Sequence, residues 1–298
     1  MESTHHRELF SQEYIASNCT IAFDPFTNVD DTVGTWASNY VIGAIGILLG
    51  IFFLANVYPC RRNPAPEWPS TTIQQQKNTA LFWQSLYFIL TALGYGVAGV
   101  HHQVYHSVDS RPEAFVVVPG ILVIVSMIPL QLSVTEVWDN SRGVRDILRL
   151  VHACVAAAMV IVTVLLETLL ATGFYNLVVL VVLAGYYIRC FTSSGRSIMR
   201  YIAAMGNAFI IAGLLAYVFL APVCGSEEAY ENCFRDCPLP TNPLVFNHNA
   251  LFHTLVALGL LFQGIGFYWW PLDEETASDD SVNKGSSSEH DDSVSTNV

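Results

Sequence analysis

Seven long and mostly apolar segments constrain this chain more than any other feature of its sequence. A helix needs about 20 apolar residues to cross the hydrocarbon core of a bilayer. Because unpaired backbone N–H and C=O groups are strongly disfavoured in lipid, such segments fold as helices. The segments occupy residues 40–58, 79–100, 115–137, 147–172, 174–188, 201–223 and 244–270. The sequence therefore predicts an all-α, integral membrane bundle of seven helices, with the tightest turn around Gly173.

The composition agrees with a membrane protein and excludes a nucleic-acid-binding one. Apolar residues make up 52% of the chain and charged residues only 13%, whereas a soluble domain has about 25% charged residues. The net charge is −12, and no basic surface for nucleic acid is expected. Residues 273–298 hold eight acidic residues and one lysine, so they contribute −7 of that charge.

Three parts of the chain follow from these patterns. Residues 1–39 are predicted to form an external N-terminal segment, residues 40–270 the seven-helix domain, and residues 271–298 a disordered acidic tail. The tail is rich in Ser and Asp and lacks apolar periodicity, which is typical of disorder. Such a tail would solubilise the protein or recruit a cytosolic partner.

Basic residues predict the orientation, since Lys and Arg are retained on the cytosolic side of a membrane. Nine of them lie in or beside the segments 60–78, 138–146 and 189–200, which share one side of a seven-span protein. The opposite side has only Arg7, Arg111 and Arg235. The N-terminus is therefore expected outside and the C-terminus in the cytosol, in the plasma membrane or the secretory pathway.

Residues expected outside the cytosol include a glycosylation site and an even number of cysteines. Asn18 begins an Asn-x-Thr sequon in the N-terminal segment, where N-glycosylation is permitted. Cys19, Cys224, Cys233 and Cys237 also fall on that side. An oxidising compartment favours up to two disulfides among them, and three pairings remain open. Free thiols are the alternative interpretation.

Polar side chains near the outer ends of three helices are the main functional signal. An ionisable residue inside a bilayer is a functional candidate by default, because it is costly unless paired. His102 and His106 end the second segment, Glu167 lies near the outer end of the fourth, and Asn249 and His253 begin the seventh. The predicted topology places all five in one outer-leaflet layer. Contacts with the membrane interface or hydrogen bonds between helices would also explain any one of these five residues.

The spacing within this layer suggests a metal site. His102 and His106 are four residues apart, as are Asn249 and His253, so each pair can share a helix face. Zinc accepts imidazole readily, and carboxylate or water can complete its coordination. The sequence therefore predicts Zn²⁺ bound by His102, His106, Asn249 and His253, with Glu167 as a catalytic base or a further ligand.

Other polar and small residues have structural interpretations. Gly43, Gly46 and Gly50 place small residues on one face of the first helix, and Gly259 and Gly266 suggest close packing of the last. Glu136 is expected to face nearby arginines at the cytosolic end of the third helix.

This arrangement resembles the CREST superfamily of seven-transmembrane proteins, which includes alkaline ceramidases, progestin and adiponectin receptors and myomaker-related proteins. The similarity covers residues 94–106 and 247–266. It implies a zinc ion bound by three histidines and hydrolysis of a lipid amide. The chain departs from the family pattern at Ala98, where those enzymes have a serine, and at Asn249, which replaces the first histidine of a His-x-x-x-His pair.

Two functions from different classes follow. The first is a metal-dependent hydrolase that attacks an amide or ester of a lipid substrate near the outer interface. The second is a receptor or scaffold, in which the polar layer binds a small ligand or holds helices together and the tail recruits cytosolic partners. A transporter is less favoured, because the sequence shows no inverted repeat and no pair of broken helices.

Overall fold

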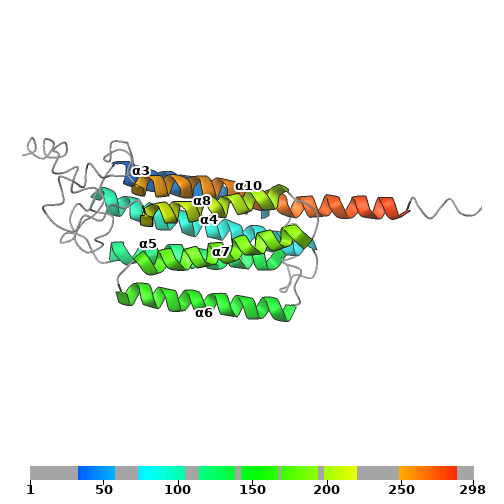
Figure 1. Cartoon of the computed structure of the whole chain (residues 1–298), viewed down its shortest axis with the longest axis horizontal. Helices are drawn as coiled ribbons and strands as arrows, with labels where there is room; N and C mark the ends of the chain where they lie inside the picture. The colour runs from blue at the N-terminus through cyan, green and yellow to red at the C-terminus, as the bar shows by residue number, and fades with distance from the viewer. Residues whose placement is uncertain are drawn as a thin grey trace, which may run out of the picture.

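The structure, a computed structural model, describes seven stretches of the chain: 33–57, 73–104, 114–137, 142–166, 169–193, 198–219 and 248–286. Each stretch is one α-helix (Figure 1). The helices are α3 (Val33–Val57), α4 (Ile73–Val104), α5 (Ala114–Val137), α6 (Arg142–Leu166), α7 (Leu169–Ser193), α8 (Ile198–Phe219) and α10 (His248–Ser286). The entirely helical class predicted from the sequence is confirmed for the described residues.

Apolar character identifies the described chain as a multi-pass integral membrane protein. Six helices are long and apolar enough to cross a membrane, and α7 has a shorter apolar stretch, Thr172–Tyr186. Large apolar side chains such as Leu48, Leu150 and Leu165 are exposed on the bundle surface. A soluble protein rarely presents so much contiguous apolar surface to water, whereas lipid chains are its natural surroundings.

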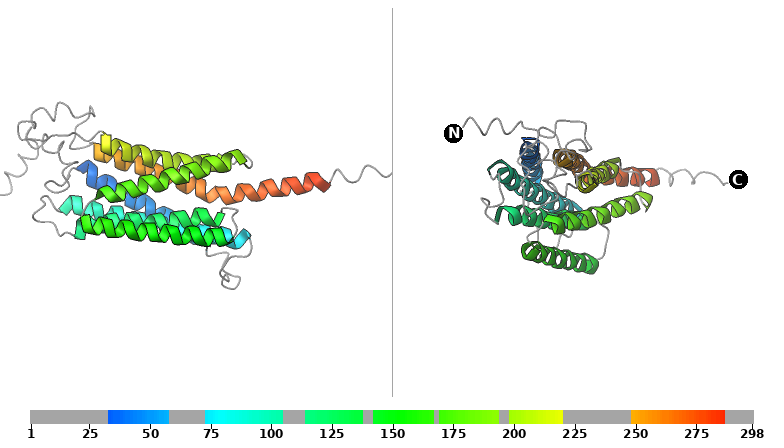
Figure 2. Two further views of the ribbon diagram at one scale, coloured as in Figure 1. Left: turned by 60° about the horizontal axis from the view of Figure 1, so that its bottom comes forward. Right: turned by 60° about the vertical axis from the view of Figure 1, so that its left-hand side comes forward.

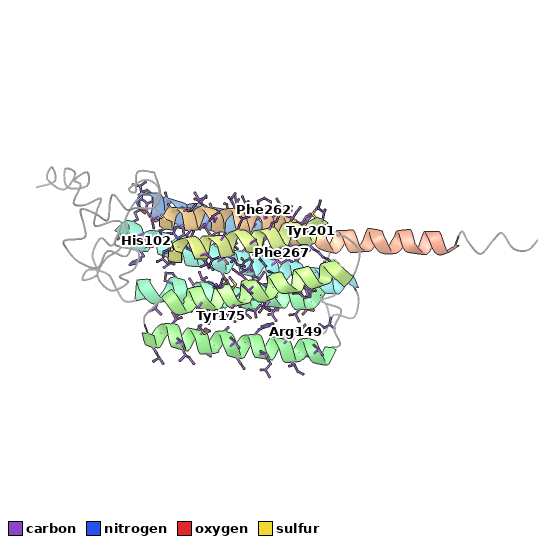
Figure 3. All side chains as sticks on the ribbon, in the orientation of Figure 1. His102, Arg149, Tyr175, Tyr201, Phe262 and Phe267 are labelled. Atoms are coloured by element: carbon purple, nitrogen blue, oxygen red, sulfur yellow. The ribbon has the colours of Figure 1, made fainter. Side chains whose placement is uncertain are left out.

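Successive helices run in opposite directions, so their ends meet at two ends of the bundle (Figures 1 and 2). One end holds the first residues of α3, α5, α7 and α10 and the last residues of α4, α6 and α8. His102 lies there, and Tyr201 lies toward the opposite end (Figure 3). We call the first of these the His102 end.

Six of the helices form a closed ring. Each helix contacts the next one in the order α10, α3, α4, α5, α7 and α8, and α8 in turn contacts α10. Helix α6 packs outside this ring against α5 and α7, at the lower edge of Figure 1. A ring of six helices can surround a pocket, and α6 can contribute to it only indirectly.

Glycines bring two pairs of ring helices into close contact. A Cβ on Gly46 of α3 would lie 2.8 Å from the carbonyl oxygen of Phe88 in α4. A Cβ on Gly206 of α8 would lie 2.7 Å from the carbonyl oxygen of Gly259 in α10. Both distances are shorter than a carbon atom tolerates, so only glycine allows these backbones to approach. The packing role predicted for the glycines of the first and last helices is confirmed here.

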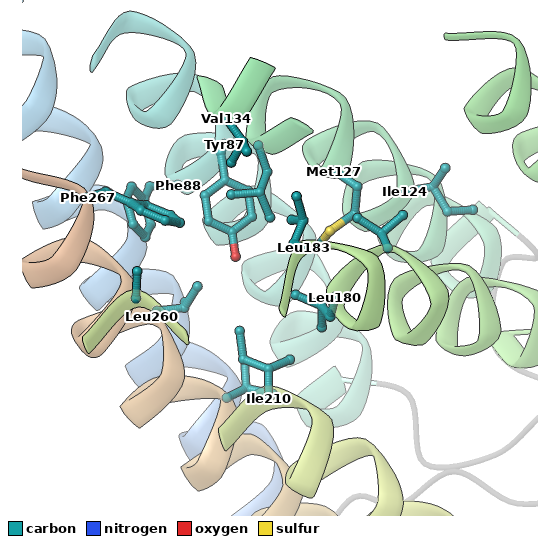
Figure 4. Close-up of a cluster of buried hydrophobic side chains, with 14 of the residues drawn as sticks. Tyr87, Phe88, Ile124, Met127, Val134, Leu180, Leu183, Ile210, Leu260 and Phe267 are labelled. Carbon is teal, nitrogen blue, oxygen red and sulfur yellow. The ribbon is translucent and has the colours of Figure 1, made fainter. Parts of the chain in front are cut away.

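The ring is tied together internally by apolar packing and one hydrogen-bonded chain. Phe88, Phe267 and Leu260 pack beside Tyr87 in the cluster shown in Figure 4. The Tyr87 hydroxyl donates to Gln263 Oε1 at 2.8 Å, and Gln263 Nε2 donates to Asn207 Oδ1 at 2.5 Å. This chain joins α4, α10 and α8 across the bundle, where lipid offers no competing partner.

An ion pair holds α6 to the ring at the end opposite to His102. Arg149 of α6 pairs with the carboxylate of Glu136 in α5, which is almost fully buried, and also with Asp146 Oδ1 at 2.8 Å. The expectation that Glu136 faces an arginine is confirmed.

Two helix boundaries differ from the sequence-based expectation. The turn expected around Gly173 is wrong, because α6 ends at Leu166 and α7 already begins at Leu169. Gly173 lies inside α7, where a glycine costs about 1 kcal/mol relative to alanine. At the other end of the chain, α10 continues to Ser286 instead of ending at Trp270. Residues 271–286 are therefore helical, since extending a formed helix requires no new nucleus.

Candidate ligand pocket

A pocket of about 200 Å³ lies inside the ring of six helices. All six ring helices contribute lining residues, and α6 contributes none of those described. On α4 the lining extends from Tyr87 to His102, which corresponds to about 22 Å along the helix axis. The pocket is therefore elongated along the bundle and reaches from the His102 end into the core.

The two halves of the pocket differ in chemistry. Asn39, His102, Asn249 and His253 line the half nearer the His102 end. Leu180, Ile210, Leu260 and Met127 line the deeper half, which continues into the apolar cluster of Figure 4. A polar end followed by an apolar depth is the usual character of a site for an amphipathic small molecule.

His253 is held by a neighbour from the first helix of the ring. Ser38 Oγ lies 2.9 Å from His253 Nδ1, and the Ser38 hydroxyl also lies 2.9 Å from the carbonyl oxygen of Thr35. A serine hydroxyl has one hydrogen, and a carbonyl oxygen can only accept. Both bonds form together only if Ser38 donates to Thr35 and His253 Nδ1–H donates to Ser38. A neutral His253 then has its lone pair on Nε2, the position used to accept a proton or bind a metal.

Aromatic packing further orients the His253 ring. The rings of Tyr95 and His253 meet edge to face, with centroids 5.7 Å apart and an interplanar angle of 90°. Phe252 packs on the ring as well, at 5.0 Å between centroids. Since Tyr95 and Phe252 both line the pocket, they hold the imidazole in the pocket wall.

Four of the residues that line the pocket each have a buried polar atom with no hydrogen-bond partner among the described residues: Asn39 Oδ1, Thr91 Oγ1, Thr172 Oγ1 and Asn176 Oδ1. Each belongs to a side chain that is more than nine-tenths buried. A buried polar atom left unsatisfied costs about 1–3 kcal/mol. Neighbouring protein atoms cover these four atoms, so the pocket does not reach them as the side chains stand.

The described lining residues include no Asp, Glu, Lys or Arg. A cation entering the pocket would therefore lose its hydration without a carboxylate nearby, which is strongly unfavourable in a low-dielectric interior, whereas the imidazoles of His102 and His253 are the groups that could carry a positive charge beside an anion. The described wall thus offers amide and imidazole groups near the His102 end and mainly hydrocarbon at depth.

The structure brings three of the predicted site residues into one pocket. His102, Asn249 and His253 all line it, and the latter two are almost fully buried. His106 and Glu167 lie outside the described residues. The same holds for the predicted external sites, Asn18, Cys19, Cys224, Cys233 and Cys237.

The described residues do not by themselves make a zinc site. Catalytic zinc sites use three protein ligands. Within the described ranges, no group of three or more His, Cys, Asp or Glu side chains could hold a metal ion. His102 and His253 supply two imidazoles to the same pocket, so the predicted site depends on His106 or Glu167. The assignment of Zn²⁺ stays a prediction.

Several pocket residues were missed by the sequence-based reasoning. Ser38 and Asn39 precede residue 40, where the first helix was expected to begin. Thr172 and Asn176 lie on either side of the turn that was expected around Gly173, so they were not considered as one polar face. Their four-residue spacing would have indicated a shared polar face once α7 was seen to begin at Leu169.

Comparisons with protein-family models, with curated proteins and with solved structures find no match to this chain.

Proposed function

We propose that this membrane protein binds an amphipathic, lipid-like molecule in the pocket inside its helix ring. One observation carries the proposal: a pocket lined by all six ring helices is polar near the His102 end and apolar at depth. A head group would lie beside Asn249 and His253, and a hydrocarbon chain would extend toward Leu180 and Leu260. Molecules of this kind partition into the bilayer in which the bundle lies.

The ligand-binding role belongs to the receptor class of function predicted from the sequence. In the proposed orientation the N-terminus is outside, so the polar half of the pocket faces the outer leaflet. The acidic C-terminal tail then lies in the cytosol, where it recruits a partner. Ligand binding would be communicated through the ring helices, because each of them contacts both its neighbours and the pocket.

Photo-crosslinking tests the proposal directly. The full-length protein in nanodiscs is incubated with a long-chain monoglyceride and, separately, with the matching fatty acid, each with a diazirine on the hydrocarbon chain. Labelling by at least one probe is expected on pocket residues such as Met127, Leu180 and Leu260. Labelling restricted to exposed surface residues such as Leu48 and Leu165 would contradict the proposal.

A second candidate function is metal-dependent hydrolysis of a lipid amide or ester. His102 and His253 line one pocket, and the Ser38 contact presents Nε2 of His253 as the ring's acceptor. The proposed set would be completed by His106, Asn249 and Glu167, in keeping with the CREST resemblance. Zinc analysis of the purified protein tests it. We expect bound zinc in the wild type and its loss in His253→Ala; a metal-free wild type or an unchanged variant would exclude this function.

A further inference from the structure

We propose that Tyr87 closes the deep end of the pocket and thereby sets the longest hydrocarbon chain that a ligand can place there. This inference rests on the proposed ligand-binding function and adds what limits the length of the ligand. It is carried by the place where the pocket ends, by what lies behind that place and by the hydrogen bond that holds Tyr87.

The pocket ends in one residue on each of five ring helices. The lining residues farthest from the His102 end are Tyr87 on α4, Met127 on α5, Leu180 on α7, Ile210 on α8 and Leu260 on α10. All five belong to one packed cluster (Figure 4). Tyr87 is 1% exposed, and Leu180 and Leu260 are fully buried. The pocket therefore narrows to a close at these residues, which we call the pocket floor.

A second layer of buried residues lies behind the pocket floor. Leu183 follows Leu180 by three residues on α7, about 4.5 Å farther from the His102 end, and Gln263 follows Leu260 by the same interval on α10. Leu183 and Gln263 are buried and do not line the pocket. Tyr87 spans both layers, because it lines the pocket while its hydroxyl donates to Gln263 Oε1 at 2.8 Å. Its ring therefore fills the space by which the pocket would otherwise be deeper.

Tyr87 is also the floor residue with a strongly hydrogen-bonding side chain. Its acceptor, Gln263, donates in turn to Asn207 Oδ1 at 2.5 Å. A movement of the ring would break the bond to Gln263 in an interior that offers no water to replace it. The apolar side chains of the other floor residues can change rotamer without such a loss. A chain that is too long for the pocket is therefore stopped by Tyr87.

Phe88 provides a matched control in the same helix. It is fully buried, and removal of its ring would leave a cavity comparable to that left by Tyr87. Phe88 does not line the pocket, and its ring stacks on Phe53 of α3 with 5.4 Å between the centroids. A general loosening of the bundle should appear in both variants, whereas a deeper pocket should appear only in the Tyr87 variant.

A series of monoglycerides of increasing chain length tests the inference, each with a diazirine at the chain end. The probes are compared in nanodiscs at equal mole fraction in the membrane, so that partitioning into lipid does not favour the longer ones. In the wild type, pocket labelling should fall about tenfold beyond a limiting length, because extra methylene groups cannot enter a well-packed core without strain. In Tyr87→Ala this limit should move to longer chains, and adducts should appear on Leu183 or Gln263. In Phe88→Ala the limit should stay where it is.

The outcomes separate the inference from the proposed function. A limiting length that is the same in Tyr87→Ala and the wild type, or that moves equally in Phe88→Ala, would overturn the role of Tyr87 and leave ligand binding standing. A wild type without a limiting length would do the same. Absence of pocket labelling at every chain length would overturn both. If Tyr87→Ala fails to fold, as judged by size-exclusion chromatography, Tyr87→Leu provides the same comparison with a shorter apolar side chain.

Discussion

Ser38 Oγ and His253 Nδ1 lie 2.9 Å apart and connect the first and last helices of the ring, although 215 positions separate them in the sequence. The contact has two consequences. It closes the ring between α3 and α10 on the polar side of the pocket, and it sets which nitrogen of His253 carries the hydrogen.

Replacing Ser38 by Ala should therefore change both stability and tautomer. We expect the free energy of unfolding to fall by about 1 kcal/mol, the usual contribution of one hydrogen bond. Nitrogen NMR of histidine-labelled protein should show Nδ1–H in the wild type and a mixture of tautomers in the variant. The control is Ser126→Ala, since Ser126 Oγ donates to the carbonyl oxygen of Val123 within its own helix, at 2.7 Å. A tautomer that is unchanged in Ser38→Ala would contradict the assignment.

Two glycines of α7 provide a matched pair for testing the pocket by filling it. A Cβ on Gly173 or on Gly185 would meet no atom within 4 Å, but only Gly173 lines the pocket. Gly173→Leu should reduce pocket labelling by the monoglyceride about tenfold, because the side chain occupies ligand space at a cost of about 1.4 kcal/mol. Gly185→Leu should leave labelling unchanged while giving the same gain in helix propensity. Equal labelling of the two variants would show that the ligand does not occupy this pocket.

The Glu136–Arg149 ion pair should contribute more to stability than the neighbouring pair of Arg149 with Asp146. The Glu136 side chain is 1% exposed, whereas that of Asp146 is 55% exposed. Glu136→Gln is expected to lower the free energy of unfolding by about 1–3 kcal/mol, as for other buried charged hydrogen bonds. Asp146→Asn should cost no more than about 1 kcal/mol, because exposed ion pairs are weak. Unfolding in detergent mixtures measures both, and equal losses would contradict this ranking.

The proposed orientation predicts a glycan at Asn18. Glycosidase treatment should lower the apparent mass of the wild type, whereas Asn18→Gln and Thr20→Ala should show no shift. Asn28→Gln serves as control, because Asn28 is not followed by Ser or Thr at the second position. An epitope tag at the N-terminus should also be accessible to antibody on intact cells. A tag detected only after permeabilisation would reverse the orientation.

Much of the helix framework could be predicted from the sequence because it depends on local properties. Apolar length locates each helix, so the expected segment 115–137 and the observed α5, Ala114–Val137, nearly coincide. Gly46 and Gly259 predicted close packing of their helices for the same reason, because the position of a glycine can be read from a single segment. The break between α6 and α7 was expected at Gly173 but lies between Leu166 and Leu169. A glycine indicates a turn only where the residues around it do not continue a helix.

The residues of the candidate site could be predicted only where a single segment places polar side chains on one face of its helix. His102, Asn249 and His253 were recognised because ionisable or amide groups are unusual near apolar helices. Asn39, Thr91, Thr172 and Asn176 were not, because single Asn and Thr residues in membrane helices usually bond to a neighbouring helix or to their own backbone. Only the structure shows that these four residues line one pocket and that their oxygens have no such partners among the described residues.

That this protein is helical and crosses a membrane several times could be predicted from its sequence, since hydrophobic length is a property of each segment taken alone. Tertiary structure decided the ring order, the exclusion of α6 from the pocket and the pairing of Ser38 with His253. These features depend on the rotation of each helix about its axis and on contacts between distant segments. Such contacts are set by packing of side chains from different helices, which no single segment specifies.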